Sequence, residues 1–275
     1  MTLPPFPGYT DVALLGSGGF ADVFAAQRTA LGRRVAIKLF RVTLDEPGAA
    51  DRFRAECAAL IRLDGQDEVL RVHDADVLPD RRPFLVSELC SRSLPQLAAQ
   101  RGGTLPVDEV LMIGRRIATA LDAAHFARVL HGDVTPQNVL FRPGGDAVLA
   151  DFGLAVLRDH RGNTATGFTA AHAAPEIVRA DGAFTARTDV YGLASTLVTA
   201  LTGQPPFPLR PGDDDAARAL LAPAAAGSGH EDLLVPAAGA FPSPALVMTF
   251  DVAAESRLGE LAALVTGAPC SVALD

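Results

Sequence analysis

Residues 131 to 138 read HGDVTPQN and residues 150 to 153 read ADFG, and these two stretches carry the strongest signal in the sequence. They bring two carboxylates and one amide, those of Asp133, Asn138 and Asp151, onto loops beside short strand-like segments. Isolated Asp residues in turns are usually caps or solvated side chains. Phosphoryl transfer needs a carboxylate beside the acceptor hydroxyl and oxygen ligands for Mg²⁺, so this spacing indicates that chemistry.

A glycine-rich stretch, GSGGFADV at residues 16 to 23, lies between two strand-like segments. Glycines let a backbone turn approach phosphate oxygens and present N–H groups to them, although a plain hairpin turn has a similar composition. A dinucleotide-binding loop is disfavoured because its glycines open a helix, whereas these lead into a strand. A Walker-type loop is excluded because no Gly-Lys-Ser or Gly-Lys-Thr occurs.

Lys38 ends the apolar segment VAIK, and Glu56 lies on the polar edge of the helix predicted after it. A lysine at the end of a buried strand commonly just reaches solvent. If it pairs with Glu56, its ammonium group is held against the α and β phosphates of a nucleotide. Movement of the helix would then make or break the pair.

Periodicity predicts a small antiparallel sheet with one helix at the start of the chain. The helix is predicted over residues 49 to 63, because Phe53, Cys57, Leu60 and Ile61 fall at helical spacing. The strands are apolar, partly β-branched segments at residues 10–15, 21–26, 34–40, 69–77 and 83–89.

The chain after Ser91 is predicted to be mostly helical. Further helices are expected over residues 106 to 126, 186 to 202 and 253 to 265, and short strands over 139–142 and 147–150. The first of these helices has an apolar stripe of Val110, Ile113, Ile117, Leu121 and Ala124. Residues 209 to 244 are rich in Ala, Pro, Gly and Asp and show weak periodicity.

Composition limits the partners. The chain has 275 residues, 49% of them hydrophobic, and a net charge of -8, so neither nucleic acid nor an anionic membrane is an expected partner. The cysteines at 57, 90 and 270 are few, odd in number and far apart, which favours a reducing cytoplasm over a disulfide framework. We expect no secretory signal and no membrane span.

These motifs, in this order from Gly16 to about Thr266, resemble the eukaryotic-type Ser/Thr protein kinases of bacteria. The resemblance implies an α+β, bilobal protein-kinase-like fold. Its N-lobe, over residues 9–90, is a small antiparallel sheet with one helix, and its C-lobe, over residues 91–268, is larger and mainly helical. AAPE at 173–176 and DVYGL at 189–193 also fit, with Asp189 anchoring the catalytic loop and Glu176 paired with Arg257.

The resemblance also implies a role for each candidate residue in binding ATP and Mg²⁺. Asp133 would orient and deprotonate the acceptor hydroxyl, while Asn138 and Asp151 would hold the metal. The phosphate loop would use Gly16, Ser17, Gly18 and Gly19, with Lys38 and Glu56 beside it. Adenine would be bound by the backbone of Glu88 and Cys90, with Ser87 behind it and the ring between Val23, Ala36 and Leu140.

Four features depart from the family pattern. Ala21 replaces the third glycine of the phosphate loop, and Gly132 replaces the arginine that clamps a phosphorylated activation loop. Residues 209 to 244 do not resemble the usual substrate-side helices. Thr135 stands at the position of a catalytic-loop lysine, so about 2 to 4 kcal/mol of transition-state stabilisation is missing unless another cation replaces it.

The activation loop would span residues 154 to 173. Its hydroxyl-bearing residues are Thr164, Thr166 and Thr169, and Thr169 occupies the place of the threonine that contacts the catalytic carboxylate in the family.

Three functions remain open from the sequence. The first is an ATP- and Mg-dependent kinase that phosphorylates Ser/Thr hydroxyls of proteins, its own chain included, with an activity that Thr135 reduces. The second is a pseudokinase or nucleotide-binding scaffold with weak or no catalysis. The third is a small-molecule kinase, since His-Gly-Asp followed by Asn also occurs in aminoglycoside and choline phosphotransferases. AAPE and the DVYGL helix argue against this third reading.

Overall fold

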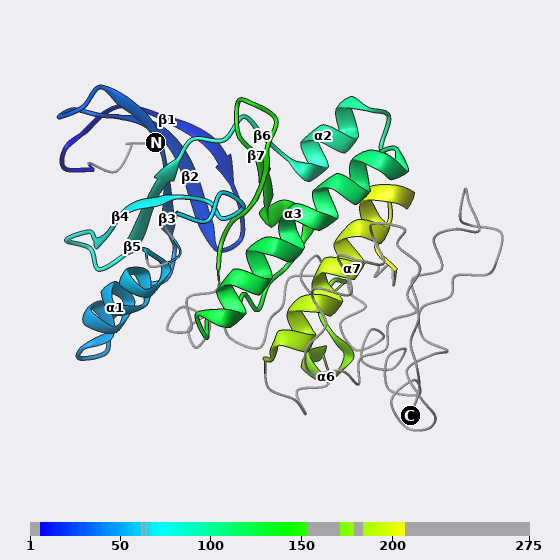
Figure 1. Cartoon of the computed structure of the whole chain (residues 1–275). Helices are drawn as coiled ribbons and strands as arrows, with labels where there is room; N and C mark the ends of the chain where they lie inside the picture. Colours follow the sequence, from blue (N-terminus) through cyan, green and yellow to red (C-terminus); the bar gives the residue numbers. More distant parts are fainter. Residues whose placement is uncertain (1–5, 62, 64, 153–170, 179–183, 207–275) are drawn as a thin grey trace.

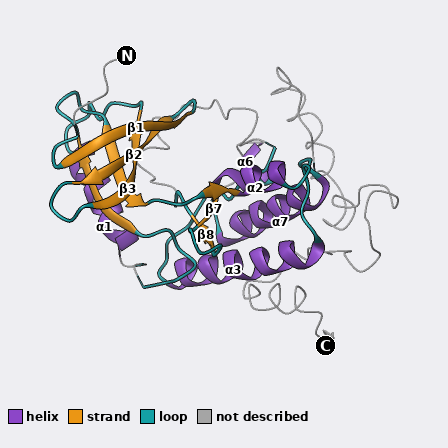
Figure 2. Cartoon of the chain, turned by 90° about the horizontal axis from the view of Figure 1, so that it is seen from above, coloured by secondary structure: helices purple, strands orange, loops and turns teal. Residues whose placement is uncertain are grey.

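The computed structural model describes residues 6–61, 63, 65–152, 171–178 and 184–206 of the chain (Figure 1). Two parts lie side by side: an antiparallel sheet with one helix, which we call the N-lobe, and a mainly helical part, which we call the C-lobe (Figure 2). The predicted α+β class is therefore confirmed. The predicted lobe limits, 9–90 and 91–268, stay predictions.

The N-lobe sheet has five strands in the order β1-β2-β3-β5-β4, and every neighbouring pair is antiparallel. These strands are β1 (Tyr9–Ser17), β2 (Ala21–Arg28), β3 (Arg33–Phe40), β4 (Val72–Val77) and β5 (Pro83–Glu88). The consecutive strands β1, β2 and β3 pair with one another through short turns. Next to β3 lies β5, and β4 forms the edge of the sheet. This order places Lys38 of β3 between Val23 of β2 and Leu85 of β5.

Both faces of this sheet are covered by apolar side chains. Helix α1 (Ala49–Ile61) buries Phe53 and Cys57 against Phe40 and Leu85, as its predicted stripe requires. A second apolar cluster covers the other face, where the ring centroid of Phe6 lies 5.6 Å from that of Phe24. Leu60 is half-buried, and the side chain of Ile61 lies outside the described part.

The C-lobe is built on two long helices, α3 (Val107–Phe126) and α7 (Ala186–Thr202), which pack side by side (Figures 1 and 2). All members of the predicted α3 stripe are buried, namely Val110, Ile113, Ile117, Leu121 and Ala124. A three-stranded sheet of β6 (Arg92–Ser93), β7 (Val139–Phe141) and β8 (Ala147–Leu149), in the order β6-β7-β8, lies against α3 through β8. A 3₁₀ turn (Pro136–Asn138) leads into β7, and a short helix α6 (Pro175–Val178) precedes α7.

Two local predictions need correction. Helix α2 (Leu94–Gln100) was not expected. Its start has a capping box, in which the Gln96 side chain accepts a hydrogen bond from the Ser93 amide at 2.8 Å. The strand predicted over residues 69–77 begins only at Val72, since Val69 forms an isolated parallel bridge with Leu149 of β8. The predicted helix 253–265 and the segment 209–244 lie outside the described residues.

Among the helices that the structure describes, none combines the length and the apolar character needed to cross a lipid bilayer.

Helix α7 approaches the loop before β7 unusually closely at Gly192. A Cβ atom built there would lie 2.7 Å from the Val134 carbonyl oxygen and 2.9 Å from the Val134 Cβ atom. The backbone carbonyl cannot move aside as a flexible side chain could. Only glycine therefore allows this loop to rest on α7.

We expect Gly192→Ala to lower the free energy of unfolding by about 1 to 3 kcal/mol, because of this collision. Gly114→Ala on α3 is the matched control, since its Cβ would meet only the end of the Leu197 side chain, at 3.0 Å. Both changes gain helix propensity, so the control should stay within about 1 kcal/mol of the wild type. Urea denaturation measures both, and equal stabilities for the two variants would contradict the close approach.

Candidate active site

The catalytic-loop motif is held by the buried carboxylate of Asp189, near the start of α7. One oxygen, Oδ2, accepts the His131 amide at 2.9 Å, and the other, Oδ1, accepts the Gly132 amide at 2.6 Å. The Nε2 atom of His125 lies 2.8 Å from Oδ2. Asp189 thus anchors this loop, as the resemblance implied.

Burial favours a neutral Asp189, but its partners favour the charged form. Burial raises the pKa of this carboxyl, and the hydrogen bonds from His125 and the two amides outweigh that effect. The net pKa lies below its ordinary value. The loop is therefore held by an ionised group that is 1% exposed.

His131 connects the loop to Ala150, between β8 and Asp151. Its Nδ1 atom accepts the Asp133 amide at 3.1 Å, so Nε2 carries the proton and donates it to the Ala150 carbonyl at 2.8 Å. Its ring also packs on Phe152, with a centroid distance of 4.7 Å. Burial lowers the pKa of His131, so the ring is neutral and acts as a positioning group.

Asp133 and Asn138 are brought together on this loop. The Asn138 amide nitrogen donates to the Asp133 carbonyl at 2.7 Å and to its carboxylate Oδ2 at 3.3 Å. The Ala150 amide donates to the Asn138 carbonyl at 2.8 Å, and Asp151 directly follows Ala150, so its backbone lies close to this pair in space. The three polar residues that the sequence singled out therefore gather in one place.

Lys38 joins this group from the other lobe. Its Nζ atom lies 2.5 Å from Asp151 Oδ2, although the two residues are 113 positions apart. Asp151 has a φ angle of 61°, a conformation that is uncommon outside glycine and that often marks functional sites. The predicted Lys38–Glu56 pair stays a prediction, because the Glu56 side chain lies outside the described part.

The glycine-rich stretch forms the turn between β1 and β2. Gly16 pairs with Val23 and Ser17 with Asp22, and the Gly18 amide donates to the Ala21 carbonyl at 2.9 Å. Ser17, Gly18 and Gly19 are exposed, like Gly16. The turn therefore presents its backbone to solvent.

The residues expected around adenine lie on adjacent strands. Ala36 of β3 pairs with Ser87 of β5, and Cys90 and Leu140 pack against one small apolar cluster made of Leu70, Val148 and Ala150. Val23, Ala36 and Leu140 are all half-buried. Burial, followed by the charge of Glu88, raises the pKa of the Cys90 thiol to about 12, so this thiol is not a nucleophile at neutral pH.

A contact that the sequence did not predict involves His172, just before AAPE. Its Nδ1 atom lies 2.8 Å from the Ser195 hydroxyl of α7, and both side chains are buried. Burial lowers the pKa of His172 to about 4. Thr164, Thr166, Thr169 and Arg257 lie outside the described residues, so their predicted roles stay predictions.

The donor set suits Mg²⁺. Asn138 turns its amide nitrogen toward Asp133, which leaves its amide oxygen facing the other way, and Asp151 supplies a carboxylate nearby. Mg²⁺ is commonly bound by one or two protein side chains together with substrate phosphates. Within the described ranges no cluster of three or more His, Cys, Asp or Glu side chains offers a metal site built from protein alone.

Comparisons with known proteins agree with this geometry. The sequence matches the family described as "Protein kinase domain" over residues 9–237. It is 37% identical over 210 residues to the serine/threonine-protein kinase PknK of Mycobacterium tuberculosis, covering 75% of this chain and 19% of PknK. It is 37% identical over 208 residues to PknL of that species, covering 72% of this chain and 50% of PknL.

The described fold also resembles a solved structure. The crystal structure of the Mycobacterium tuberculosis PknI kinase domain aligns with a TM-score of 0.60 at 31% sequence identity, covering 80% of this chain and 86% of that chain. The bilobal fold expected from the sequence is thereby confirmed. This chain spans about a fifth of PknK and half of PknL.

We expect Asp189→Asn to destabilise the protein by about 2 to 3 kcal/mol. The side-chain NH₂ group of Asn would face a backbone N–H, so that this buried N–H would lose its acceptor. Asp122→Asn, an exposed change on α3, should stay within about 0.5 kcal/mol of the wild type. Chemical denaturation of the three proteins gives both values. Similar losses in the two variants would contradict the anchoring role.

The buried His172 should make stability fall in mild acid. Its folded pKa of about 4 lies below the ordinary 6.5, so the unfolded chain takes up the proton first. This contribution is present above pH 6.5, and up to about 3 kcal/mol is lost as the pH falls toward 4. His172→Gln removes the titration, so its unfolding free energy should depend less on pH than that of the wild type. Parallel curves would refute the assignment.

Proposed function

Because this chain belongs to the protein kinase domain family, we propose that it binds Mg-ATP and transfers the γ-phosphoryl group to Ser or Thr hydroxyls of proteins, its own chain included. The observation that carries the proposal is the grouping of Lys38, Asp133, Asn138 and Asp151 at the meeting of the two lobes. The relatives' names, which describe serine/threonine-protein kinases, support this choice of acceptor over a small molecule.

Asp133 is the group that orients the acceptor hydroxyl and takes its proton. A carboxylate in this position accepts the hydroxyl proton as the bond to phosphorus forms. Its position is fixed by Asn138 on one side and by the His131 contact to its amide on the other. The loop therefore presents the carboxylate without needing to reorganise during the reaction.

Lys38 binds the phosphates, with Glu56 as the partner that would hold it in place. Asn138 and Asp151 would hold Mg²⁺, which when bound neutralises charge on the phosphate oxygens. Their chemistry fits this group, because both side chains offer oxygen ligands. Lys38 and Asp151 contact each other at 2.5 Å, so bound phosphates and metal would take over part of that interaction.

The glycine-rich turn is best explained by a phosphate ligand. A Cβ atom at Gly16 would meet nothing within 4 Å, and one at Gly18 would meet only the Ala21 carbonyl at 3.6 Å. Neither residue has a positive φ angle. Since neither internal packing nor backbone strain requires glycine there, close approach of a ligand to the backbone N–H groups is the remaining physical reason.

Adenine would lie between the lobes, against Val23 and Ala36 on one side and Leu140 on the other. The backbone of Glu88 and Cys90 would supply the hydrogen bonds. These residues lie on β2, β3, β7, at the end of β5 and just after it, close to the pairs Ala36–Ser87 and Val23–Lys38. We also propose a cytoplasmic location, because ATP is available there.

Thr135 favours a second candidate function, a nucleotide-binding scaffold with weak or no catalysis. It stands where related kinases carry a lysine, and its side chain is buried, with 6% exposure. A buried threonine supplies no positive charge to a phosphate. Reduced turnover is therefore part of the proposal, and loss of turnover with retained nucleotide binding would favour the scaffold.

Asp133→Asn should lower Mg-dependent transfer of labelled γ-phosphate to the chain itself or to a generic protein by at least about a hundredfold, because the base is removed. ATP with Mg²⁺ should still raise the melting temperature of this variant, since binding does not need the base. Asp122→Asn should transfer phosphate at the wild-type rate. A wild type no more active than Asp133→Asn would overturn catalysis, and absence of any thermal shift would overturn nucleotide binding.

A further inference from the structure

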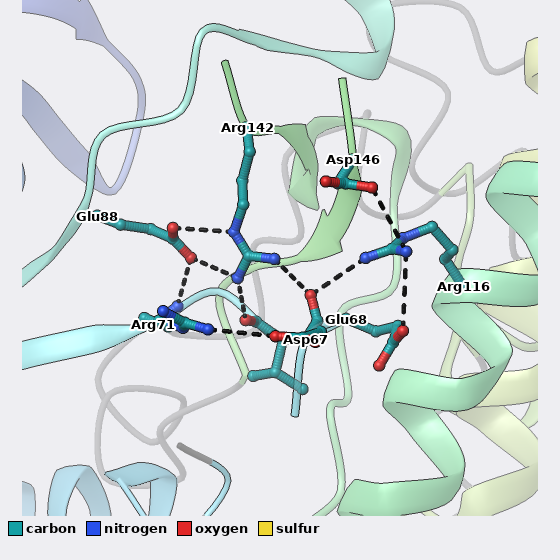
Figure 3. A network of polar contacts seen from close by, with 8 residues as sticks. Asp67, Glu68, Arg71, Glu88, Arg116, Arg142 and Asp146 are labelled. Atoms are coloured by element: carbon teal, nitrogen blue, oxygen red, sulfur yellow. Dashed lines mark hydrogen bonds and ion pairs between the residues drawn. The ribbon is translucent and has the colours of Figure 1, made fainter. Parts of the chain in front are cut away.

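A cluster of charged side chains joins the two lobes beside the segment expected to bind adenine (Figure 3). At its centre, the carboxylate of Glu88, the last residue of β5, meets the guanidinium group of Arg142, which follows β7. Arg142 Nε donates to Glu88 Oε2 at 2.9 Å, and Arg142 Nη2 donates to Oε1 at 2.7 Å. Such two-point contacts fix both the distance and the orientation of the two groups.

The same guanidinium group binds the backbone between α1 and β4. Its Nη1 atom donates to the Asp67 carbonyl at 2.5 Å and its Nη2 atom to the Val69 carbonyl at 3.2 Å. All three nitrogens of this C-lobe side chain therefore donate to N-lobe groups. A planar, rigid donor set of this kind cannot be replaced by lysine.

Glu88 is held on its backbone as well as on its side chain. Its amide donates to the Arg71 carbonyl at 3.0 Å, while its Oε1 atom accepts the Arg71 amide at 2.9 Å. Its carbonyl accepts the Ser87 hydroxyl at 3.2 Å. A change in the Glu88 side chain is therefore transmitted directly to the peptide groups on which adenine binding depends.

The pair is mostly withdrawn from solvent. The Arg142 and Glu88 side chains are 16% and 13% exposed. Burial raises the pKa of Glu88, but the hydrogen bonds from Arg142 and the Arg71 amide outweigh burial and bring the pKa below its ordinary value. Glu88 is thus ionised at neutral pH, and removal of Arg142 would leave a buried carboxylate with only the Arg71 amide among these donors.

We propose that Arg142 is a positioning residue for the nucleotide: by gripping Glu88 it fixes the backbone from Ser87 to Cys90 and ties that segment to the C-lobe. This inference rests on the proposed binding of ATP between the lobes. It predicts that Arg142 controls affinity for the adenine end of the nucleotide, while Asp133 and its neighbours control the chemical step. The phosphate end, held by Lys38 and the glycine-rich turn, should be little affected.

Arg116 of α3 provides a matched control on the same network. Its Nη2 atom donates to the same Asp67 carbonyl at 3.3 Å, and its Nε atom donates to the Ala147 carbonyl at 2.9 Å. Its remaining ionic contacts go to Glu68 at 3.8 Å and Asp146 at 3.5 Å. Arg116 therefore joins the same lobes through the same segment, but its contacts are with groups other than Glu88.

The test compares Arg142→Ala, Arg142→Lys and Arg116→Ala by titration with a fluorescent ATP analogue and Mg²⁺. We expect Arg142→Ala to raise the dissociation constant about tenfold, with kcat changed less than about twofold. Adenosine, measured by competition, should lose the same factor, because the defect lies at the adenine end. Arg142→Lys should recover only part of the affinity, and Arg116→Ala should bind within about twofold of the wild type.

Each outcome bears on a separate claim. Equal weakening by Arg116→Ala and Arg142→Ala would overturn the positioning role in favour of general lobe packing, as would unchanged adenosine affinity in Arg142→Ala. If Arg142→Ala does not fold, Glu88→Gln carries the test, since it keeps the shape but weakens the pair, and unchanged affinity there would overturn the proposal. A wild type that binds ATP without turnover would refute only the proposed catalysis. A wild type that binds no ATP would refute both the proposed function and the positioning role of Arg142.

Discussion

The buried carboxylate of Asp189 is the group on which the arrangement of the site depends. A charge withdrawn from water is costly unless polar groups surround it, and here the surrounding donors are the amides of His131 and Gly132 and the ring of His125. Two of these donors belong to the catalytic loop, so the hydrogen bonds that stabilise the buried charge also fix the conformation of the loop. Gly192 completes the arrangement by letting α7 touch the Val134 backbone.

The two lobes are connected by polar contacts that differ in exposure and in role. Lys38 and Asp151 are 23% and 29% exposed, so water can compete for their charges. Glu88 and Arg142 are more buried, at 13% and 16%, and every nitrogen of the guanidinium group has an acceptor. If phosphates bind as proposed, the first contact is suited to rearrange. The second is suited to keep its geometry, since a satisfied buried network is rigid.

Much of the fold could be predicted from local patterns, and the physical reason is periodicity. The stripe on α3 and the pair Phe53 and Cys57 on α1 are buried as their spacing requires. Helix α2 was missed because it is short and has little room for a periodic pattern, although Ser93 followed three residues later by Gln96 is the sequence pattern of a capping box. Val69 was assigned to a strand from its β-branched surroundings, but it pairs with Leu149 of the other lobe, a contact that no local pattern reports.

The sequence by itself determined which side chains are candidates for the proposed chemistry, because one motif places Asp133 and Asn138 within one loop and a second motif places Asp151 shortly after it. It also determined the glycines of the turn between β1 and β2. The tertiary structure alone decided that Lys38 meets Asp151, that His172 meets Ser195, and that Arg142 grips Glu88. Those partners are far apart along the chain, so their pairing depends on how the lobes pack, which no local spacing encodes.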